Sequence, residues 1–322
     1  MGGRSVLDAI GNTPMVELRR VVPVGSARVL AKLELTNPTG SMKDRVAKAM
    51  IEAAGRDGRL QPGGTVVEYT AGTTGISLAL VCATQGYGLK IVFSDAFSED
   101  KRWMMEAFGA RLTIVRSARR AINAALIQEM VRTAQRIARE PGHWFCDQLT
   151  NRDGASGYHP MGEEIWQQTG GKVDAFVQGV GTAHSIHGVT EALWRHDRRV
   201  RIVAVEPAES AVLSGGASGE HRIEGIGIGY VPPLWDRSLV TSIVPIGTPA
   251  AQAMCRRLAR EEGLFVGPSS GANVLAALQV ASELGPGATV VTVMVDSGLR
   301  YLSTDLFQGP ERPADPPPTG SS

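Results

Sequence analysis

The chain has 322 residues, of which 43% are hydrophobic and 20% are charged, as in an ordinary globular protein large enough for two lobes. Its 33 basic and 32 acidic side chains leave a net charge of +1, which excludes a general attraction to nucleic acid or to an anionic membrane surface. The sequence contains three scattered cysteines without metal-ligand spacing and no apolar run of membrane-spanning length. We therefore expect reduced thiols, no metal site and a cytoplasmic protein.

Apolar segments of strand length alternate with helical patterns along almost the whole chain. Strands are predicted at residues 28–35, 64–69, 90–94, 111–115, 174–180, 201–206, 263–266 and 289–295. Helices are predicted at residues 42–56, 74–87, 99–109, 121–139, 157–169, 185–196, 249–262 and 271–284. Such alternation is typical of βαβ units and predicts an α/β fold with a mostly parallel sheet. The tail, residues 309–322, is rich in proline, glycine and serine, and we expect it to be disordered.

Four strand-to-helix junctions are rich in glycine, serine and threonine, and parallel α/β sheets bind their ligands at such junctions. The first, residues 37–45, reads NPTGSMKDR and places Lys43 in the first turn of a predicted helix, where we expect Ser41 and Asp44 to form a capping box. The positive end of a helix disfavours a protonated amine. Lys43 would therefore lose its proton easily, as a Schiff base with an aldehyde cofactor requires; the alternative is a solvated lysine near a helix start.

The second junction follows the strand predicted at 64–69 and reads TAGTTG over residues 70–75. Its threonine hydroxyls and free backbone N–H groups at a helix start can bind a carboxylate or a phosphate. The alternative is an ordinary capped helix start without a ligand.

The third junction, residues 178–188, reads QGVGTAHSIHG and is similar to a phosphate cradle, since two hydroxyl side chains accompany consecutive backbone N–H donors. A dinucleotide site is the alternative, because Gly179 and Gly181 match the start of the GxGxxG fingerprint. That alternative is weak, since His184 stands where the third glycine is required and the sequence has no Walker lysine motif.

The fourth junction, residues 267–273, reads GPSSGAN and opens a predicted helix. Ser269 is either the N-cap of this helix, which is favoured for the segment alone, or a hydroxyl that meets a heterocyclic ring nitrogen. Taken singly, none of the four junctions identifies a ligand.

Taken together and in order, the junctions resemble the cysteine synthase (O-acetylserine sulfhydrylase)/cystathionine β-synthase family, which are pyridoxal-phosphate enzymes of fold type II. The resemblance runs from Leu7 to Leu306 and includes GNTPMV at 11–16, GIGIGY at 225–230 and DSGLRYLS at 296–303. It implies two open, twisted, mostly parallel sheets flanked by helices, with the active site between two lobes. The smaller, mobile lobe would span 44–147 and the larger, cofactor-binding lobe 1–43 plus 148–308. The resemblance also implies a homodimer.

Carried over position by position, the resemblance implies that Lys43 is the catalytic residue, which binds pyridoxal 5′-phosphate covalently and exchanges the substrate α-proton. The cofactor would further be bound by Thr73, Gly181, Thr182, Ala183, His184, Ser185 and, at the ring nitrogen, Ser269. The substrate carboxylate would be bound by Thr70, Ala71, Gly72, Thr73, Thr74 and Gln148. A serine at the ring nitrogen, in place of a carboxylate, leaves that nitrogen unprotonated, which favours β-elimination over transamination.

The implied function is β-replacement on an activated serine, O-acetylserine or O-phosphoserine, through an aminoacrylate and with a sulfur nucleophile, giving cysteine or an S-substituted cysteine. The GIGIGY and DSGLRYLS segments favour the sulfhydrylases over the dehydratases and threonine synthases of this fold. Cystathionine β-synthase stays open as an alternative, and so does a non-catalytic binding or regulatory protein on the same fold. A serine acetyltransferase is a possible partner.

Two loops depart from the family pattern. Residues 70–74 read TAGTT in place of TSGNT, so Thr73 offers no amide to the cofactor. Residues 181–185 read GTAHS in place of GTGGT, which requires Ala183 and His184 to adopt backbone angles open to residues with a Cβ. We expect His184 to be an uncharged spacer, with a protonated group at the phosphate as the alternative. The altered loops predict a divergent member with a non-standard donor or nucleophile.

Overall fold

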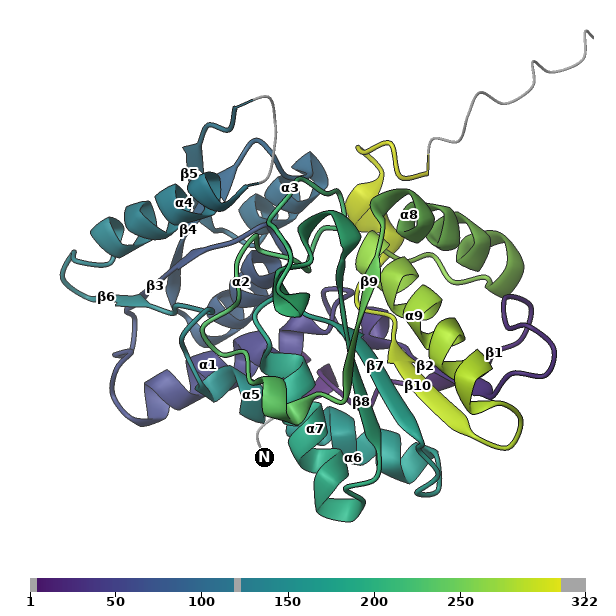
Figure 1. Cartoon of the computed structure of the whole chain (residues 1–322). Helices are drawn as coiled ribbons and strands as arrows, with labels where there is room; N and C mark the ends of the chain where they lie inside the picture. Colours follow the sequence, from purple (N-terminus) through teal and green to yellow (C-terminus); the bar gives the residue numbers. More distant parts are fainter. Residues whose placement is uncertain (1–4, 119–122, 308–322) are drawn as a thin grey trace, which may run out of the picture.

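Two β-sheets organise the chain in the computed structural model, which describes residues 5–118 and 123–307 (Figure 1). The larger sheet has six strands in the order β1 (Met15–Leu18), β2 (Arg28–Lys32), β10 (Thr289–Val293), β7 (Ala175–Gly179), β8 (Arg201–Pro207) and β9 (Ser242–Ile246). The smaller sheet has four strands in the order β5 (Arg111–Val115), β4 (Gly88–Ser94), β3 (Thr65–Tyr69) and β6 (His143–Phe145). Apart from the antiparallel pair β1–β2, all these strand pairs are parallel, so the predicted α/β class is confirmed.

Helices cover the sheets and connect the parallel strands. They are α1 (Lys43–Arg56), α2 (Thr73–Gln85), α3 (Glu99–Ala107), α4 (Ala124–Ile137), α5 (Asp153–Ser156), α6 (His159–Gln168), α7 (His184–His196), α8 (Thr248–Arg257) and α9 (Pro268–Leu284). In Figure 1 the smaller sheet and α4 lie on the left, while α8 and α9 lie beside the larger sheet on the right. No helix of the described residues is long and apolar enough to cross a membrane.

The central strands of the larger sheet form its core. All residues of β7 (AFVQG) and β10 (TVVTV) are buried, as continuous apolar runs in a covered parallel sheet should be. Helix α9 packs on both strands. Cys82, Cys146 and Cys255 are buried free thiols, which agrees with the expectation of reduced cysteines.

Three strands and one loop differ from the sequence prediction. The strands β1, β6 and β9 were not predicted: the first two are only four and three residues long, and Pro245 interrupts the apolar pattern of the third. A proline is tolerated there because β9 is an edge strand. The strand predicted at 263–266 is wrong; it consists of a left-handed Gly263 that ends the preceding helical turn and an isolated bridge from Val266 to Ser297.

The lobe boundaries proposed at 43/44 and 147/148 stay a prediction, although all four strands of the smaller sheet fall within residues 65–145. The predicted disorder of 309–322 and the first residues of the helix predicted at 121–139 lie outside the described residues.

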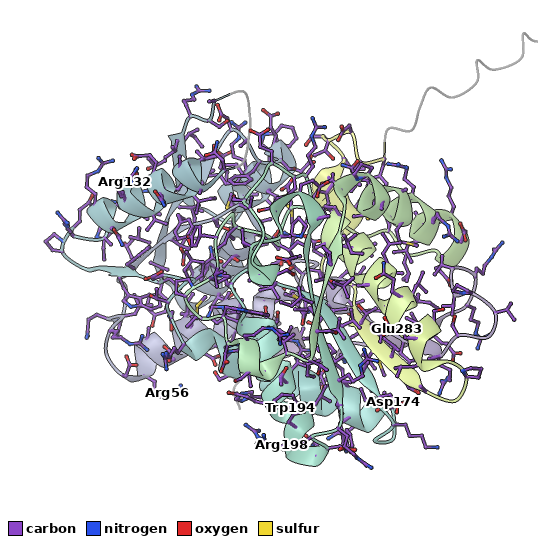
Figure 2. All side chains as sticks on the ribbon, viewed as in Figure 1. Arg56, Arg132, Asp174, Trp194, Arg198 and Glu283 are labelled. Atoms are coloured by element: carbon purple, nitrogen blue, oxygen red, sulfur yellow. The ribbon has the colours of Figure 1, made fainter. Side chains whose placement is uncertain are left out.

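A buried ion-pair network anchors α1. The guanidinium of Arg45 donates two hydrogen bonds of 2.8 Å to the carboxylate of Glu34 and two of 2.8 Å to that of Glu164. Lys32 forms a further ion pair with Glu164 at 2.7 Å. Most arginines lie at the surface, as Arg56 and Arg132 do in Figure 2. Arg45 is only 4% exposed, so its charge depends on the two carboxylates that pair with it. The network fixes the helix that begins at the candidate catalytic lysine.

Candidate active site

Lys43 is the first residue of α1, as predicted, but the predicted capping box is wrong. Ser41 forms a β-bridge with Asp296, and its hydroxyl accepts a hydrogen bond from the Lys43 backbone N–H at 3.1 Å. The Asp44 carboxylate instead accepts from the Thr39 backbone N–H at 2.8 Å and from the Ser77 hydroxyl at 2.6 Å. The helix start is therefore tied to the preceding turn and to α2, which fixes the backbone of Lys43.

The amine of Lys43 is shielded from water by the residues around it. Burial lowers the pKa of Lys43 to about 8, and the negative charge of Asp296 opposes this shift in part. A substantial fraction of the amine is thus neutral at mildly alkaline pH. This is the state in which a lysine attacks an aldehyde.

The loop of residues 70–74 connects β3 to α2. The N-cap of α2 is Gly72, whose φ of 118° is a conformation that favours glycine, and no side chain caps the helix start. A Cβ at Gly72 would lie 2.6 Å from the Cδ atom of Lys101, so a side chain at this position has no room. The helix start therefore keeps backbone N–H groups for an anion, as the ligand-binding interpretation requires.

Gln148 lies against this loop in a fixed orientation. The buried Thr74 hydroxyl donates to Gln148 Oε1 at 2.8 Å, and Gln148 Nε2 donates to the carbonyl of Tyr69 at 2.8 Å. The Gln148 backbone N–H donates to the buried carboxylate of Glu68 at 2.9 Å. The structure thus brings Thr74 and Gln148, two predicted substrate-binding residues that are 74 positions apart in the sequence, into direct contact.

The loop of residues 181–185, the phosphate loop, connects β7 to α7. Ala183 has φ 72° and ψ −8°, in the left-handed region, so the expectation that its backbone angles suit a residue with a Cβ is wrong. The family pattern has glycine here for this reason, and the alanine holds the same turn at a strain of roughly 1–2 kcal/mol. His184 meets the expectation, since it is the first residue of α7.

The phosphate loop is packed closely against residues 225–227. A Cβ at Gly181 would lie 2.6 Å from the carbonyl oxygen of Gly225. Gln178 Nε2 donates to the Ser185 hydroxyl at 2.8 Å, which leaves the proton of that hydroxyl free for another acceptor. Ser185 is thus prepared to donate to an anion in the loop.

His184 is buried and connects two segments of the site. Its Nδ1 lies 2.9 Å from the Thr182 hydroxyl and its Nε2 lies 2.6 Å from the carbonyl oxygen of Asn151. Burial lowers the pKa of His184 to about 4, so the ring is uncharged at neutral pH, as expected. Because it joins the phosphate loop to the segment that follows Gln148, however, it is more than a spacer.

Ser269 is the second residue of α9, and the N-cap is Gly267, so the N-cap interpretation of Ser269 is wrong. Its hydroxyl is buried and has no hydrogen-bond partner among the described residues. A Cβ at Gly225 would lie 3.7 Å from this oxygen, which places the hydroxyl beside the phosphate loop and residues 225–227. A buried unpartnered hydroxyl next to a pocket fits a polar ligand atom such as a ring nitrogen.

One cavity collects most of the predicted site. Its lining includes Lys43, Thr70, Ala71, Thr73, Thr74, Gln148, Gly181 and Thr182. Gly72, Ala183, His184, Ser185 and Ser269 do not line it. The cavity also receives Lys101 from α3 and Glu224, which form a buried ion pair, with the Lys101 ammonium 4.4 Å from the ring centre of Tyr301. Neither residue was predicted from the sequence, although Glu224 directly precedes the GIGIGY segment.

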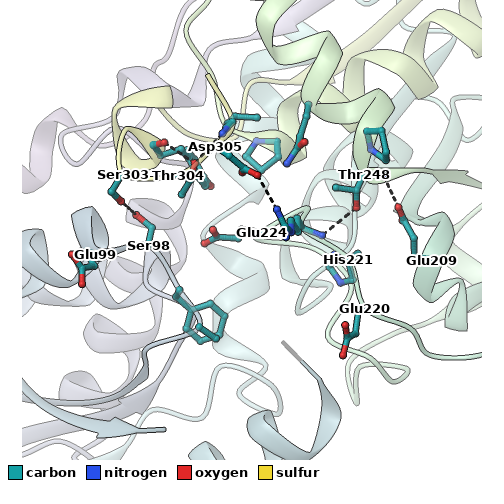
Figure 3. Close-up of a pocket in the computed structure, with 18 of the residues that line it drawn as sticks. Ser98, Glu99, Glu209, Glu220, His221, Glu224, Thr248, Ser303, Thr304 and Asp305 are labelled. Atoms are coloured by element: carbon teal, nitrogen blue, oxygen red, sulfur yellow. Dashed lines mark hydrogen bonds and ion pairs between the residues drawn. The ribbon is translucent and has the colours of Figure 1, made fainter. Parts of the chain in front are cut away.

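A wider cavity of about 970 Å³ adjoins the first and shares Phe97, His221 and Glu224 with it. Figure 3 shows Ser98 and Glu99 on one side of this cavity and Glu209 and Glu220 on the other. Lys43 lines the first cavity and not this one.

Comparisons with known proteins identify the family. The family model described as "Pyridoxal-phosphate dependent enzyme" matches residues 6–296. A cysteine synthase from Staphylococcus aureus (strain Mu50) is 42% identical over 305 residues, covering 94% of this chain and 96% of the relative.

Solved structures agree. O-ureido-L-serine synthase is 36% identical with a TM-score of 0.90, and the match covers 98% of both chains. The O-acetylserine dependent cystathionine beta-synthase from Helicobacter pylori is 32% identical with a TM-score of 0.88, and the match covers 95% of this chain and 99% of that structure. The family match over most of the chain, together with these relatives, shows that the chain belongs to the pyridoxal-phosphate dependent enzymes, in the branch that contains the cysteine synthases.

Proposed function

We propose that the protein replaces the β-substituent of O-acetylserine with a sulfur nucleophile, giving cysteine or an S-substituted cysteine. The observation that carries this proposal is the buried, unpartnered hydroxyl of Ser269. When bound, pyridoxal phosphate supplies an electron sink for the carbanion at the substrate Cα. A neutral hydroxyl at its ring nitrogen keeps that sink weak, which favours loss of a β-leaving group over transamination.

The residues present fit the cofactor. Lys43 would hold it and would move the proton at the substrate Cα, since its amine is buried and has a lowered pKa. Ser269 would bind the ring nitrogen, and Thr73 would lie at the cofactor from the start of α2. The phosphate would be bound by the hydroxyls and backbone N–H groups of Gly181, Thr182, Ala183, His184 and Ser185.

The substrate carboxylate would bind at the uncapped start of α2. Thr70, Ala71, Gly72, Thr73 and Thr74 would surround it, and Gln148 would support the loop through its bond with Thr74. The N-terminal end of a helix favours a negative charge, so this position suits a carboxylate.

The rate at which the apoenzyme recombines with pyridoxal phosphate is expected to rise with pH through about 8. Only the unprotonated amine attacks the aldehyde, and the pKa of Lys43 is about 8 because of burial. Stopped-flow absorbance of the bound cofactor measures this rate. A rate that keeps rising to the pKa of an ordinary lysine, about 10.4, would contradict the burial argument.

Replacing Thr74 by valine is expected to raise the KM for O-acetylserine about tenfold while changing kcat little. The substitution removes the hydrogen bond to Gln148 Oε1 and leaves a buried acceptor unpaired, at a cost of about 1–3 kcal/mol. A loss of uniform binding appears in KM. Steady-state kinetics checks this, with Thr84→Val as control, since Thr84 lies exposed on the same helix.

Absorbance spectra of the holoenzyme test the proposed function. Addition of O-acetylserine is expected to shift the spectrum of the bound cofactor, and subsequent addition of sulfide is expected to restore it.

A panel of donors (O-acetylserine, O-phosphoserine) and acceptors (sulfide, thiosulfate, other thiols, homocysteine) then tests whether this is the divergent member that the loop changes predict. Efficient turnover with O-acetylserine and sulfide alone would overturn the divergence, and a preference for homocysteine would identify a cystathionine β-synthase, as named for the Helicobacter pylori structure. A spectrum that responds to neither donor would overturn the proposed function.

We further infer a cytoplasmic protein, because its three thiols are buried and free, and a homodimer, because the family resemblance implies one. Light scattering coupled to size-exclusion chromatography measures the mass in solution. The same experiment with an added serine acetyltransferase tests the proposed partner, for which a joint elution peak is expected.

A further inference from the structure

His184 belongs to a short chain of hydrogen bonds that begins at the backbone and ends at the cofactor site. A carbonyl oxygen only accepts hydrogen bonds, so the contact of 2.6 Å between Nε2 and the Asn151 carbonyl requires that Nε2 carry a proton. In the neutral ring Nδ1 is then an acceptor, and the Thr182 hydroxyl donates to it at 2.9 Å. Thr182 lines the cavity and has a single proton.

The Thr182 hydroxyl has one proton, and two acceptors compete for it: Nδ1 of His184 and an anion in the phosphate loop. As long as the ring is neutral, the proton of the Thr182 hydroxyl is directed to His184 and is not available to an anion. When Nδ1 also carries a proton, the ring donates to the Thr182 oxygen, and the hydroxyl proton is released toward the cavity. The protonation state of His184 therefore decides whether Thr182 is a donor to the phosphate loop.

The ring cannot escape this coupling by rotating away. A Cβ at Gly154 would lie 2.8 Å from Nε2 and 2.9 Å from Cδ2 of His184, so the ring is packed closely against α5. Both of its nitrogens have a partner at hydrogen-bond distance. The hydrogen bond between His184 and Thr182 can therefore reverse its direction when a proton is added, while the ring stays in place.

We propose that His184 takes up one proton when a dianionic phosphate binds the loop of residues 181–185, and that Thr182 then donates its own proton to the anion. The proton is taken from solvent and is bound at Nδ1, so one N–H bond forms there and one O–H bond of the solvent donor breaks; no bond between heavy atoms changes. This inference rests on the proposed placement of the cofactor phosphate in that loop. His184 is thereby a positioning residue, which acts on the cofactor through Thr182.

The charges around His184 determine the sign of the effect. Lys43 on α1 and His187 on its own helix disfavour the protonated ring, as burial does, while Asp153 on α5 and the Asn151 carbonyl favour it. A dianion in the loop adds a strong favourable charge on the side of Thr182. Because the pKa of the ring is low in the empty site and raised by the anion, affinity for a dianion increases as pH falls through the raised pKa.

His221, at the other side of the cavity, is an internal contrast. Its Nε2 bonds to the Gly227 carbonyl at 2.7 Å and its Nδ1 accepts from the backbone N–H of Ile223 at 3.2 Å. A backbone N–H cannot reverse its role, so protonation of His221 would break a bond. A hydroxyl can change from donor to acceptor. Of the two histidines, His184 is the one whose Nδ1 faces a hydroxyl.

The test is a titration of the full-length apoenzyme with sulfate, a dianion whose own charge is constant between about pH 5 and pH 7. Lys43, with a pKa of about 8, stays protonated over this range.

Nitrogen NMR of ¹⁵N-histidine-labelled protein reports the ring state directly, and the His184→Gln variant assigns the signals. At saturating sulfate and about pH 6, we expect the His184 signals to change from the neutral Nε2–H form to imidazolium. The affinity for sulfate is expected to rise at least about tenfold between pH 7 and pH 5, within the limit of tenfold per pH unit for one proton.

Two variants complete the design. Thr182→Val removes the reversible hydroxyl and keeps the histidine, so the pH dependence of its sulfate affinity should be weaker than in the wild type; His187→Asn, on the same helix, should keep the full dependence. Sulfate that binds while His184 stays neutral would overturn this inference alone. The absence of sulfate binding at the loop would overturn the phosphate placement as well, whereas the reaction with O-acetylserine is tested separately by the spectra.

Discussion

Lys43→Ala is expected to lower turnover with O-acetylserine by at least about 10³-fold, because proton transfer by a positioned side chain alone contributes roughly 10²–10⁴-fold. The variant is also expected to lose the covalent attachment of the cofactor, which borohydride reduction followed by mass spectrometry of the peptide detects. The fold should survive the change, since the Lys43 amine forms no ion pair within the described residues and its burial is unfavourable to the charged form. Thermal unfolding of the two cofactor-free proteins should therefore show a Tm for the variant equal to or above that of the wild type.

Lys48→Ala is the matched control, since Lys48 lies on the same helix and, among residues 5–118 and 123–307, its side chain donates only to the backbone carbonyl of Leu7. Its activity should stay within about twofold of the wild type. If Lys43→Ala kept more than a tenth of the activity, the base would have to be another amine of the cavity. Lys101 is then the candidate, and the double variant would decide between the two.

The local signals in the sequence predicted the parts of the site that a single strand-to-helix junction determines. A glycine- and serine-rich turn after an apolar strand is enough to place Lys43 at a helix start, and the same holds for the threonines of residues 70–74. Hydrogen bonds that depend on the turn itself were not predictable: Asp44 bonds to Thr39 rather than to Ser41. The sequence spacing permits both, and the bridge from Ser41 to Asp296 decides between them.

Contacts between distant segments account for most of what was missed. Lys101 and Glu224 pair across 123 positions, and no local pattern links them. The left-handed backbone of Ala183 contradicts the intrinsic preference of alanine, because packing of residues 181–185 against Gly225 overrides it. His184 could be placed in the phosphate loop from the sequence, but its partner Asn151 came from tertiary packing alone.

Arg45→Met is expected to destabilise the protein by about 3–5 kcal/mol, because it removes one partner of a buried ion pair. The Glu34 side chain is fully buried and would keep a charge without its bidentate partner, while Glu164 would keep Lys32. Urea unfolding at constant m-value measures the change. Arg59→Met is the control, since Arg59 pairs with Asp57 and Asp153 at the surface, where such bonds contribute at most about 1 kcal/mol.

The double variant Arg45→Met, Glu34→Leu separates the cost of an unpaired charge from the value of the network, because it removes both partners of one buried pair and leaves Glu164 paired with Lys32. Replacing a complete buried ion pair by apolar groups is often neutral, so the double variant should recover much of the stability that the single variant loses. Its turnover then tests a different property, namely whether the network is needed to hold the start of α1. Recovered stability with lost activity would show that Arg45 fixes the position of Lys43, two residues before it. Loss of stability in the double variant equal to that of the single variant would contradict the unpaired-charge argument.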